Sequence, residues 1–227
     1  MSIIAGYFSL ICFVLLLIKS FTRKFRWDKP DEILERLHKP LSATLLVSSV
    51  FHVIFAIPVF HTRSILVIVT GLGLVLLLVL IILLGHGRRD DRAKWLRRHR
   101  ILAGLLLLMA IVHMVTYMTD FQDYQTRVGS ITLHGIDTSG MPDGEYTGEY
   151  DAGYIYAKVR VIISEGRIET IHLLEHENER GQAAESVIAD ILDTQTFPVD
   201  AVSGATNSSK VIQMAVQNAL EETAVKE

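Results

Sequence analysis

Four long apolar runs dominate the first half of the chain and predict four membrane-spanning helices. They occupy residues 3–18, 41–60, 64–85 and 101–118, and each is close to the ~20 residues that a helix needs to cross the hydrocarbon core. The first run is short, and a signal peptide is the alternative interpretation. No Lys or Arg precedes this run, positive charge follows it from Lys19, and no small-residue cleavage site is evident. We therefore expect a retained anchor, and an all-α four-helix transmembrane bundle at residues 1–118.

The second half of the chain has shorter patterns. Residues 119–140 are polar and predict a tether. The elements expected after it are a turn at 143–146, alternating strands at 154–164 and 167–174 joined by a turn at Glu165-Gly166, and amphipathic helices at 182–194 and 207–222. Together they predict a small α+β domain with an antiparallel sheet at residues 141–227.

Charge divides the chain in the same way, with a net +9 for residues 1–118 and −12 for residues 119–227. Two loops between apolar runs are basic, at 19–39 and 86–100. Their basic residues are Lys19, Arg23, Lys24, Arg26, Lys29, Arg36 and Lys39, and Arg88, Arg89, Arg92, Lys94, Arg97, Arg98 and Arg100. Because Lys and Arg collect on the cytoplasmic side, we expect both termini and the acidic domain to be extracytoplasmic in a multi-pass protein of the cytoplasmic membrane. Basic runs also bind nucleic acid, but the flanking spans favour topology, and no nucleic-acid partner is expected.

Cysteine is nearly absent. Cys12, inside the first apolar run, is the only one. This excludes disulfide frameworks, thiolate zinc sites, iron–sulfur clusters and CxxCH haem attachment. Any redox metal must therefore be held mainly by histidine.

Histidine occurs in two spans with the same spacing. His38 and His52 are 14 residues apart around the second span, and His99 and His113 are 14 apart around the fourth. A shift of 61 positions superposes the two segments, which indicates an internal repeat in which the four helices form two related halves. Histidine inside a bilayer is rare and usually functional.

The 14-residue spacing places both histidines of a span on one seam. Fourteen residues return to within roughly 40° of the starting face and rise about 21 Å. Since both spans run from inside to outside, His38 is expected level with His99, and His52 level with His113. Two facing imidazoles can supply both axial ligands of a b-type haem, so two levels predict two haems. Four small residues would let the flat haem macrocycle approach the helix backbone: Ser42, Ala43, Ala103 and Gly104. The alternative is four histidines that only make hydrogen bonds between helices or at the interface.

Residues 31–118 resemble the four-helix di-haem b-type cytochromes of ferric-reductase-like and quinol-oxidising membrane proteins. The matching features are the His-Lys/Arg opening and the histidine 14 residues later. Pro40, directly after His38-Lys39, departs from the pattern. We interpret it as the first turn of the helix, which would put His38 at the helix entrance and make it the least secure ligand. His61 is a candidate base for a quinol site near the outer face; for His61 and for His86, a polar residue at an interface is the alternative.

A Gly/Ser-rich turn, residues 200–209, leads into the last predicted helix. Free N–H groups and the positive dipole end at a helix N-terminus suit a phosphate, although an ordinary helix cap would explain the turn equally well. The turn resembles the S/T-G-A-T attachment motif of the FMN-binding domain family, which includes covalently flavinylated subunits of sodium-pumping NADH:quinone reductases. The upstream segments 143–148, 153–154 and 165–168 also match, so the resemblance covers about residues 141–222.

The resemblance implies a covalent FMN on Thr206, through a phosphoester bond installed by an extracytoplasmic, Mg²⁺-dependent FAD:protein FMN transferase. Ser203, Gly204 and Ala205 match the rest of the motif, and Asp200 matches its acidic lead. Three tyrosines are candidates for stacking on the flavin, with packing as the alternative: Tyr146, Tyr154 and Tyr156. His172 and His176 lie among glutamates and are interpreted as a solvated acidic edge rather than a metal site.

Two haems and a tethered flavin predict an electron-transfer protein. The chain has no Rossmann glycine pattern, so NAD(P)H binding is not expected, and a quinol or a partner reductase must be the donor. The electrons would reach an extracytoplasmic acceptor through the haems and FMN. The alternatives are a redox-sensing or assembly subunit of a larger membrane complex, and a membrane-anchored flavin carrier without haem.

Overall fold

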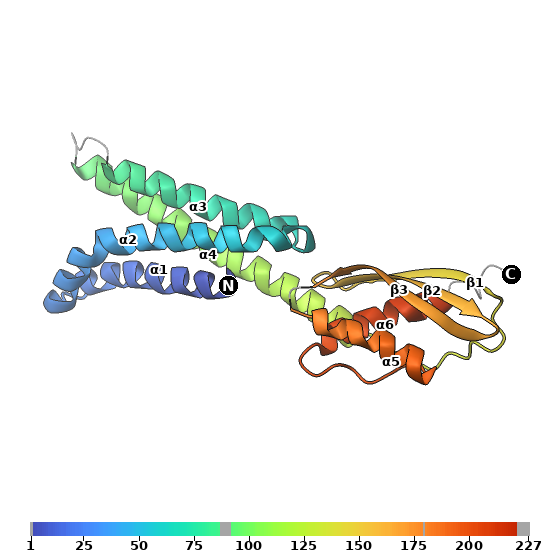
Figure 1. Ribbon diagram of the computed structural model, residues 1–227. Helices are drawn as coiled ribbons and strands as arrows, with labels where there is room; N and C mark the ends of the chain where they lie inside the picture. Colours follow the sequence, from blue (N-terminus) through green and yellow to red (C-terminus); the bar gives the residue numbers. More distant parts are fainter. Residues whose placement is uncertain (1, 87–91, 179, 222–227) are drawn as a thin grey trace. The chain divides into compact units, whose positions relative to one another are not determined.

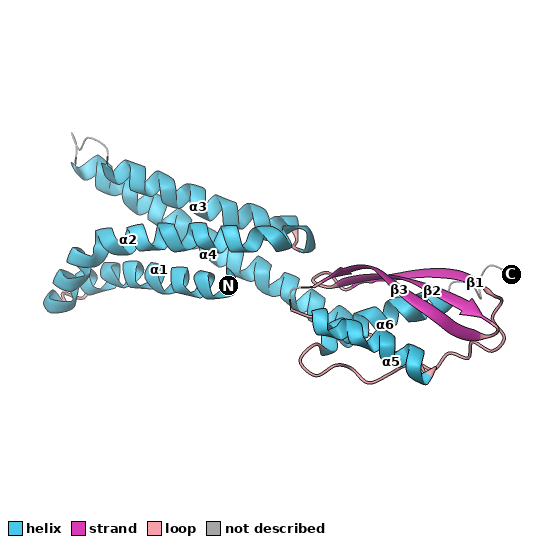
Figure 2. Cartoon of the chain, viewed as in Figure 1, coloured by secondary structure: helices cyan, strands magenta, loops and turns pink. Residues whose placement is uncertain are grey.

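The chain forms two compact units, residues 1–118 (the membrane unit) and residues 119–227 (the C-terminal unit). The structure is a computed structural model that describes residues 2–86, 92–178 and 180–221. The membrane unit consists of helices, whereas the C-terminal unit combines a three-stranded sheet with helices (Figure 2). The predicted fold class is confirmed.

Four helices of the chain are long and apolar enough to cross a membrane. The elements are α1 (Ser2–Lys24), α2 (Asp28–Ala56) followed by the 3-10 helix η1 (Ile57–Thr62), α3 (Ile65–His86) and α4 (Arg92–Gly129). Large apolar side chains remain exposed along all four, among them Phe8, Phe51, Leu76 and Leu108. Exposed apolar patches of this extent mark a lipid-facing or protein-facing surface, so the chain is a membrane protein.

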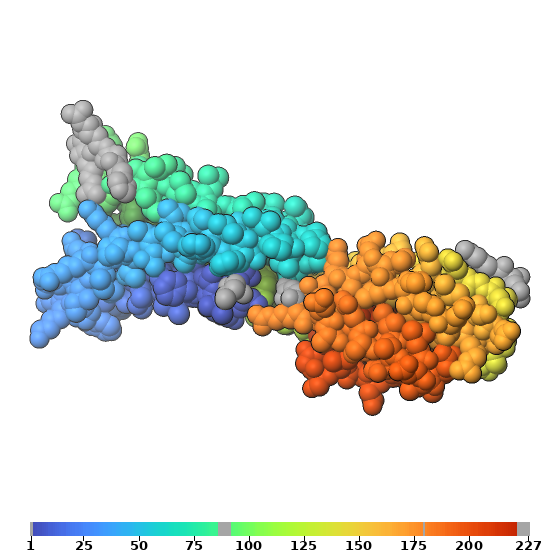
Figure 3. Space-filling view, viewed as in Figure 1, coloured from blue at the N-terminus to red at the C-terminus, as the bar shows by residue number. Residues whose placement is uncertain are grey.

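Packing inside the membrane unit is concentrated between α1 and α2, whose side chains lie side by side along their length (Figure 3). The Ser9 and Ser48 hydroxyls form a hydrogen bond of 2.8 Å between these helices. Among the residues that the structure describes in this unit, the buried apolar cluster consists of Cys12, Leu45, Leu78 and Leu106. Among the described residues, α4 makes no extended close backbone contact with another helix of this unit.

Pro40 lies inside α2 and not in its first turn, because the helix begins at Asp28. The interpretation of Pro40 as a helix start, with His38 at the helix entrance, is therefore wrong. The polar residues from Asp28 onward continue the helix beyond the apolar run. The Ser42 hydroxyl donates to the His38 carbonyl at 2.7 Å, which is the kind of side-chain bond that accompanies proline in membrane helices. His38 is thus held by helical turns on both sides.

Helix α4 continues to Gly129, so the first half of the predicted 119–140 tether is helical. Its last turns contribute Tyr124 and Val128, which are 7% and 3% exposed, to the core of the C-terminal unit. Farther along, the His134 backbone N–H donates to the Gln217 side chain on the last helix. The stretch after the fourth apolar run is thus a packed part of the unit.

The C-terminal unit is an antiparallel sheet in the order β1-β2-β3, with helices against one face (Figure 1). Its elements are β1 (Gly144–Asp151), β2 (Tyr156–Ser164), β3 (Arg167–Glu177), the 3-10 helix η2 (Gln182–Ser186), α5 (Val187–Thr194) and α6 (Thr206–Glu221). The expectation of a turn at 143–146 is wrong for residues 144–146, which start β1 and pair with 161–163 of β2.

The core of this unit lies between the sheet and α6. Inward-facing residues of β2 alternate with exposed ones, and apolar residues of α6 meet them. Fully buried members are Val159, Val161, Ile163, Val211, Ile212 and Val216. Each contributes about 1.5–3 kcal/mol relative to an exposed side chain. This packing fixes the N-terminus of α6 relative to the sheet.

Gly148 of β1 permits the close approach of α6. A Cβ at this position would come within 3.0 Å of backbone atoms of Ala215 and Ala219. Since the helix backbone cannot yield as a side chain can, we expect Gly148→Ala to destabilise the unit by about 3 kcal/mol or more. The destabilisation is measured as a lower midpoint of thermal unfolding for the full-length variant in detergent. Gly144→Ala, on the same strand with contacts no closer than 3.9 Å, is the control, and equal midpoints for both variants would contradict this account.

Candidate functional site

The turn before α6 brings an exposed hydroxyl to a helix N-terminus. Gly204 has a φ of 79°, a left-handed conformation that favours glycine. It lets the chain reverse so that the Ala205 N–H donates to the Val202 carbonyl at 3.0 Å. Thr206 then begins α6, with its side chain exposed, while Ala205 is 6% exposed. The Thr206 hydroxyl is therefore accessible to a modifying enzyme.

Buried polar side chains of α6 hold this turn in place. The Ser209 hydroxyl accepts from the Val202 N–H at 3.0 Å and donates to the Ala205 carbonyl at 3.1 Å. The Gln213 side chain, 1% exposed, accepts from the Val199 N–H at 2.9 Å. Buried hydrogen bonds of this kind are costly to break, so the turn is fixed to the helix.

The first turn of α6 can bind a phosphate next to Thr206. Its leading N–H groups have no partner within the helix, and the positive end of the helix dipole favours an anion. Asp200, Ser203 and Gly204 are exposed beside this helix end. The residues that the sequence singled out in the turn therefore lie together around one accessible hydroxyl.

The three candidate tyrosines have different surroundings. The Tyr146 hydroxyl donates to the Pro142 carbonyl at 2.5 Å, and its ring is in the core. Tyr156 is half-buried and donates to Glu149. Loss of water around the hydroxyl, and then this hydrogen bond, raise the pKa of Tyr156 to about 12. Tyr154 stacks on Tyr124, with ring centroids 4.9 Å apart. Of the three, Tyr154 is the one linked to the Thr206 turn.

That link runs through Tyr124 and Asn207, which the sequence reasoning missed. The Asn207 side-chain amide donates to the Tyr124 hydroxyl at 2.9 Å. The two residues are 83 positions apart, so no local pattern could reveal the contact. Tyr124 also lies in a stretch interpreted as a tether.

His176 is buried, contrary to the interpretation of a solvated acidic edge, whereas His172 is exposed. The His176 side chain is 3% exposed, and its Nδ1 lies 3.0 Å from Glu185 and 3.2 Å from the Asn178 amide. Its Nε2 is buried and has no hydrogen-bond partner in the described part of the chain. The period-two alternation of β3 could not indicate this burial, because Glu185 comes from η2.

In the membrane unit, His38 of α2 and His99 of α4 face each other. Their ring centroids are 6.1 Å apart, with an angle of 67° between the planes. Both Nδ1 atoms are buried without a hydrogen-bond partner in the described residues. Trp95, one turn before His99, stacks on its ring at 5.4 Å and anchors its indole N–H on the Leu84 carbonyl.

The two histidines at the other level contact neighbouring helices: His52 of α2 contacts α1, and His113 of α4 contacts α3. The His52 Nδ1 lies 2.8 Å from the Ser2 carbonyl, and the His113 Nδ1 lies 3.0 Å from the Thr70 hydroxyl. A carbonyl can only accept, so His52 Nδ1 is the protonated nitrogen and its Nε2 carries the lone pair. The expected pairing of histidines from α2 and α4 is seen for His38 and His99, whereas the pairing of His52 with His113 stays a prediction.

Glycines on the neighbouring helices make room for the imidazole rings of His52 and His113. A Cβ at Gly6 of α1 would come 3.0 Å from His52 Nδ1, and one at Gly71 of α3 would come 3.1 Å from His113 Cε1. These distances are shorter than ordinary contacts, so a larger residue in place of either glycine would displace the neighbouring imidazole. The sequence reasoning did not single out either glycine for this purpose.

The remaining histidines of the membrane unit are His61 and His86. His61 lies in η1, beyond the end of α2. His86 ends α3, and its side chain lies outside the described residues, as do Arg88 and Arg89 of the second basic loop. Within residues 2–86, 92–178 and 180–221, no group of three or more His, Cys, Asp or Glu side chains is arranged to hold a metal ion.

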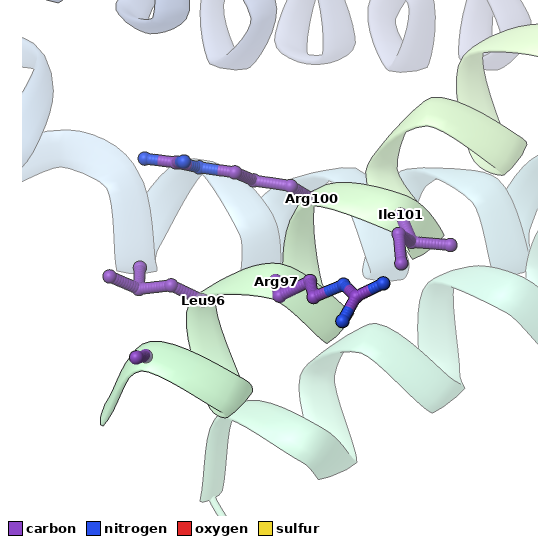
Figure 4. A pocket seen from close by; sticks show the side chains of 5 residues that line it. Leu96, Arg97, Arg100 and Ile101 are labelled. Carbon is purple, nitrogen blue, oxygen red and sulfur yellow. The ribbon is translucent and has the colours of Figure 1, made fainter. Parts of the chain in front are cut away.

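The start of α4 lines a hollow of about 500 Å³ in the membrane unit. Figure 4 shows Leu96, Arg97, Arg100 and Ile101 around it, with the two guanidinium groups extending in opposite directions from the helix. These arginines flank His99 in the sequence. The hollow therefore combines apolar surface with two cations.

Comparison with known proteins identifies the C-terminal unit. Residues 152–221 match the FMN-binding domain family. An uncharacterized protein of Treponema pallidum (strain Nichols) is 35% identical over 85 residues, which are 36% of this chain and 24% of that protein. The chain thus covers about a quarter of the length of that relative. The match includes the whole turn and Thr206, so the chain carries an FMN-binding domain at residues 152–221 and is a flavoprotein with four helices able to span a membrane.

Proposed function

We propose that the protein is a membrane electron-transfer flavocytochrome, which passes electrons from a quinol or a partner reductase through two b haems and a covalent FMN to an extracytoplasmic acceptor. The observation that carries this proposal is the pairing of His38 with His99 in a chain that also carries an FMN-binding domain. We assign His52 and His113 to the second haem by the 14-residue spacing that they share with the first two histidines. A haem iron can be held by two histidines, and here one would come from α2 and the other from α4.

The His38–His99 pair has the spacing that a shared metal ion requires. An imidazole nitrogen lies about 2.0–2.1 Å from a bound metal, and the ring centroid roughly 1 Å behind the nitrogen, so two rings on one ion have centroids about 6 Å apart. The observed separation is 6.1 Å. This spacing supports, as part of the proposal, a haem iron held between His38 and His99.

At the other level, the hydrogen bonds of the histidines support metal binding. Metal-ligating histidines usually give their second ring N–H to a carbonyl or similar acceptor, which fixes the tautomer and the ring orientation. The Ser2 carbonyl does this for His52, and the Thr70 hydroxyl is the Nδ1 partner of His113. In the tautomer with Nδ1 protonated, each Nε2 would carry the lone pair that binds a metal.

When bound, the haem irons and the flavin supply the redox chemistry. The chain would hold each macrocycle by its axial imidazoles and by small residues that leave space beside α4. A Cβ at Gly104 would meet no described atom within 4 Å. Arg100, which directly follows His99, would pair with a propionate carboxylate of the haem held by His99.

We propose Thr206 as the covalent attachment site of FMN, which the exposure of its hydroxyl supports. An FAD:protein FMN transferase would join the Thr206 oxygen to the FMN phosphorus of FAD. The bond between the two phosphates breaks, AMP leaves, and the hydroxyl proton passes to a base. The first N–H groups of α6 would hold the resulting phosphodiester.

The proposed topology places both termini and the FMN-binding domain outside the cytoplasm. It rests on the basic residues of the 19–39 and 86–100 loops, which favour the cytoplasmic side. The transferase and the acceptor would then meet the flavin on the same side of the membrane.

Reduction by a quinol tests this function. The full chain is co-expressed with an FMN transferase, purified in detergent and mixed anaerobically with a reduced quinol. We expect reduced b-haem bands followed by bleaching of the flavin, and in Thr206→Ala the haem bands without bleaching. Bleaching of the flavin with no haem bands would contradict the proposal and leave a membrane-anchored flavin carrier.

A further inference from the structure

Trp95 joins the ring of His99 to the backbone of a neighbouring helix. It lies in the first turn of α4, four residues before His99, where side chains share one face of a helix. The two rings are stacked, with centroids 5.4 Å apart and an angle of 11° between the planes. The Trp95 indole N–H donates to the Leu84 carbonyl at 3.0 Å. Leu84 is in the last turn of α3, where carbonyls lack a partner within the helix, so α3 supplies a fixed acceptor for Trp95.

The orientation of the His99 ring depends on this stack more than on hydrogen bonds. The second side-chain torsion of histidine is broad, so a neighbour must hold the ring plane. In a metal-ligating histidine, a hydrogen bond at the other ring nitrogen usually does this. His52 and His113 have such partners on Nδ1, whereas the buried Nδ1 of His99 has none in the part of the chain that the structure describes. The flat indole of Trp95 takes this role at His99.

His38 meets His99 from the other helix at a large angle. The ring centroids are 6.1 Å apart and the planes are inclined at 67°, nearer to perpendicular than to parallel. Because the Trp95 plane is within 11° of the His99 plane, rotation of the His99 ring toward the plane of His38 would break the stack. Trp95 therefore holds the angle between the two imidazoles from the α4 side.

We propose that Trp95 is a positioning residue for His99, and that it sets the relative orientation of the two imidazole planes on a haem iron between His38 and His99. This inference rests on the proposed haem at that level. The angle between two axial imidazoles affects the d orbitals of the iron. Near-perpendicular planes give low-spin ferric iron a strongly anisotropic electron paramagnetic resonance (EPR) signal, and near-parallel planes give a rhombic one. Ligand orientation by neighbouring groups is one means by which a protein tunes a metal centre.

EPR of the oxidised protein tests this role. The full chain is co-expressed with an FMN transferase and purified in detergent. The signal of this haem is identified as the one that disappears when His38 and His99 are both replaced by alanine. In the wild type we expect a strongly anisotropic signal, because the planes are inclined at 67°. In Trp95→Leu, which frees the His99 ring to rotate, we expect this signal to broaden and shift toward the rhombic type, while the other haem signal is unchanged.

Two further variants separate the stack from general packing. Trp95→Phe keeps an aromatic ring and removes the bond to Leu84, so it disturbs the bundle least. Haem loss to excess apomyoglobin should be fastest in Trp95→Leu, by roughly twofold to tenfold over wild type for one lost aromatic contact, and intermediate in Trp95→Phe. Trp27→Leu makes the same change at the other tryptophan, which is 58% exposed just before α2. It should leave the signal and the haem retention at wild-type values.

The outcomes distinguish positioning from a purely structural role. A structural role would lower the thermal unfolding midpoint without changing the signal, so wild-type signals in both Trp95 variants would overturn the inference whatever their midpoints. A rhombic signal in the wild type, or the same change in Trp27→Leu as in Trp95→Leu, would also overturn it. A wild-type chain without haem would instead refute the proposed function on which the inference rests.

Discussion

Thr206→Ala is expected to abolish covalent flavinylation. Thr206 offers an exposed hydroxyl as the first residue of α6, where the helix N-terminus favours the phosphate of the donor. Alanine removes the oxygen that forms the phosphoester bond and retains a good helix former, so the fold should be kept. Intact-protein mass spectrometry of the co-expressed chain should show no flavin adduct.

Two matched variants define what the Thr206 result means. Thr206→Ser keeps a hydroxyl at the same place, and we expect it to retain an adduct. Ser203→Ala removes a hydroxyl three residues earlier in the same exposed turn, and it should also be flavinylated. A full adduct on Thr206→Ala, or loss of the adduct only in Ser203→Ala, would show that another residue carries the flavin.

Joint replacement of His52 and His113 by alanine is expected to remove one of two b haems. These imidazoles are the proposed axial ligands of one level, whereas His38 and His99 would still hold the other. Haem content, measured as the pyridine haemochrome per chain, should fall by about half. The adduct on Thr206 should persist, because it forms in the separate C-terminal unit.

A milder variant separates ligation from packing. Thr70→Val removes the hydroxyl that lies 3.0 Å from His113 Nδ1, and loss of such a partner typically costs about 10–100-fold in metal affinity. We expect this variant to lose haem on dilution or chelator challenge faster than wild type. His61→Ala, which changes a histidine outside both pairs, is the control. Equal haem content in the double variant and the wild type would contradict the assignment of His52 and His113.

The predictable features were those that repeat along the chain. Apolar runs of span length indicated the four helices, and the shared 14-residue spacing indicated that His38 and His99 would meet. The attachment turn was predictable from the sequence because its residues are contiguous. Each of these signals depends on local order, and the structure brings each set of residues together.

The features that could not be predicted depend on contacts between distant residues. β1 was missed because Asp143-Gly144-Glu145-Tyr146 has the composition of a turn, although pairing with β2 makes most of it a strand. Pro40 was interpreted as a helix start because proline breaks isolated helices, yet α2 continues through it. The bond between Asn207 and Tyr124 joins residues 83 positions apart. In each case, tertiary packing outweighs the local preference.

A cofactor count on one purified chain tests the central claim most directly. The full protein, co-expressed with an FMN transferase, is purified in detergent, and haem and FMN are quantified in the same sample. We predict two b haems and one FMN per chain, with reduced spectra typical of bis-histidine iron. A chain that carries FMN but no haem would contradict the account, and the paired histidines would then serve only to hold helices together.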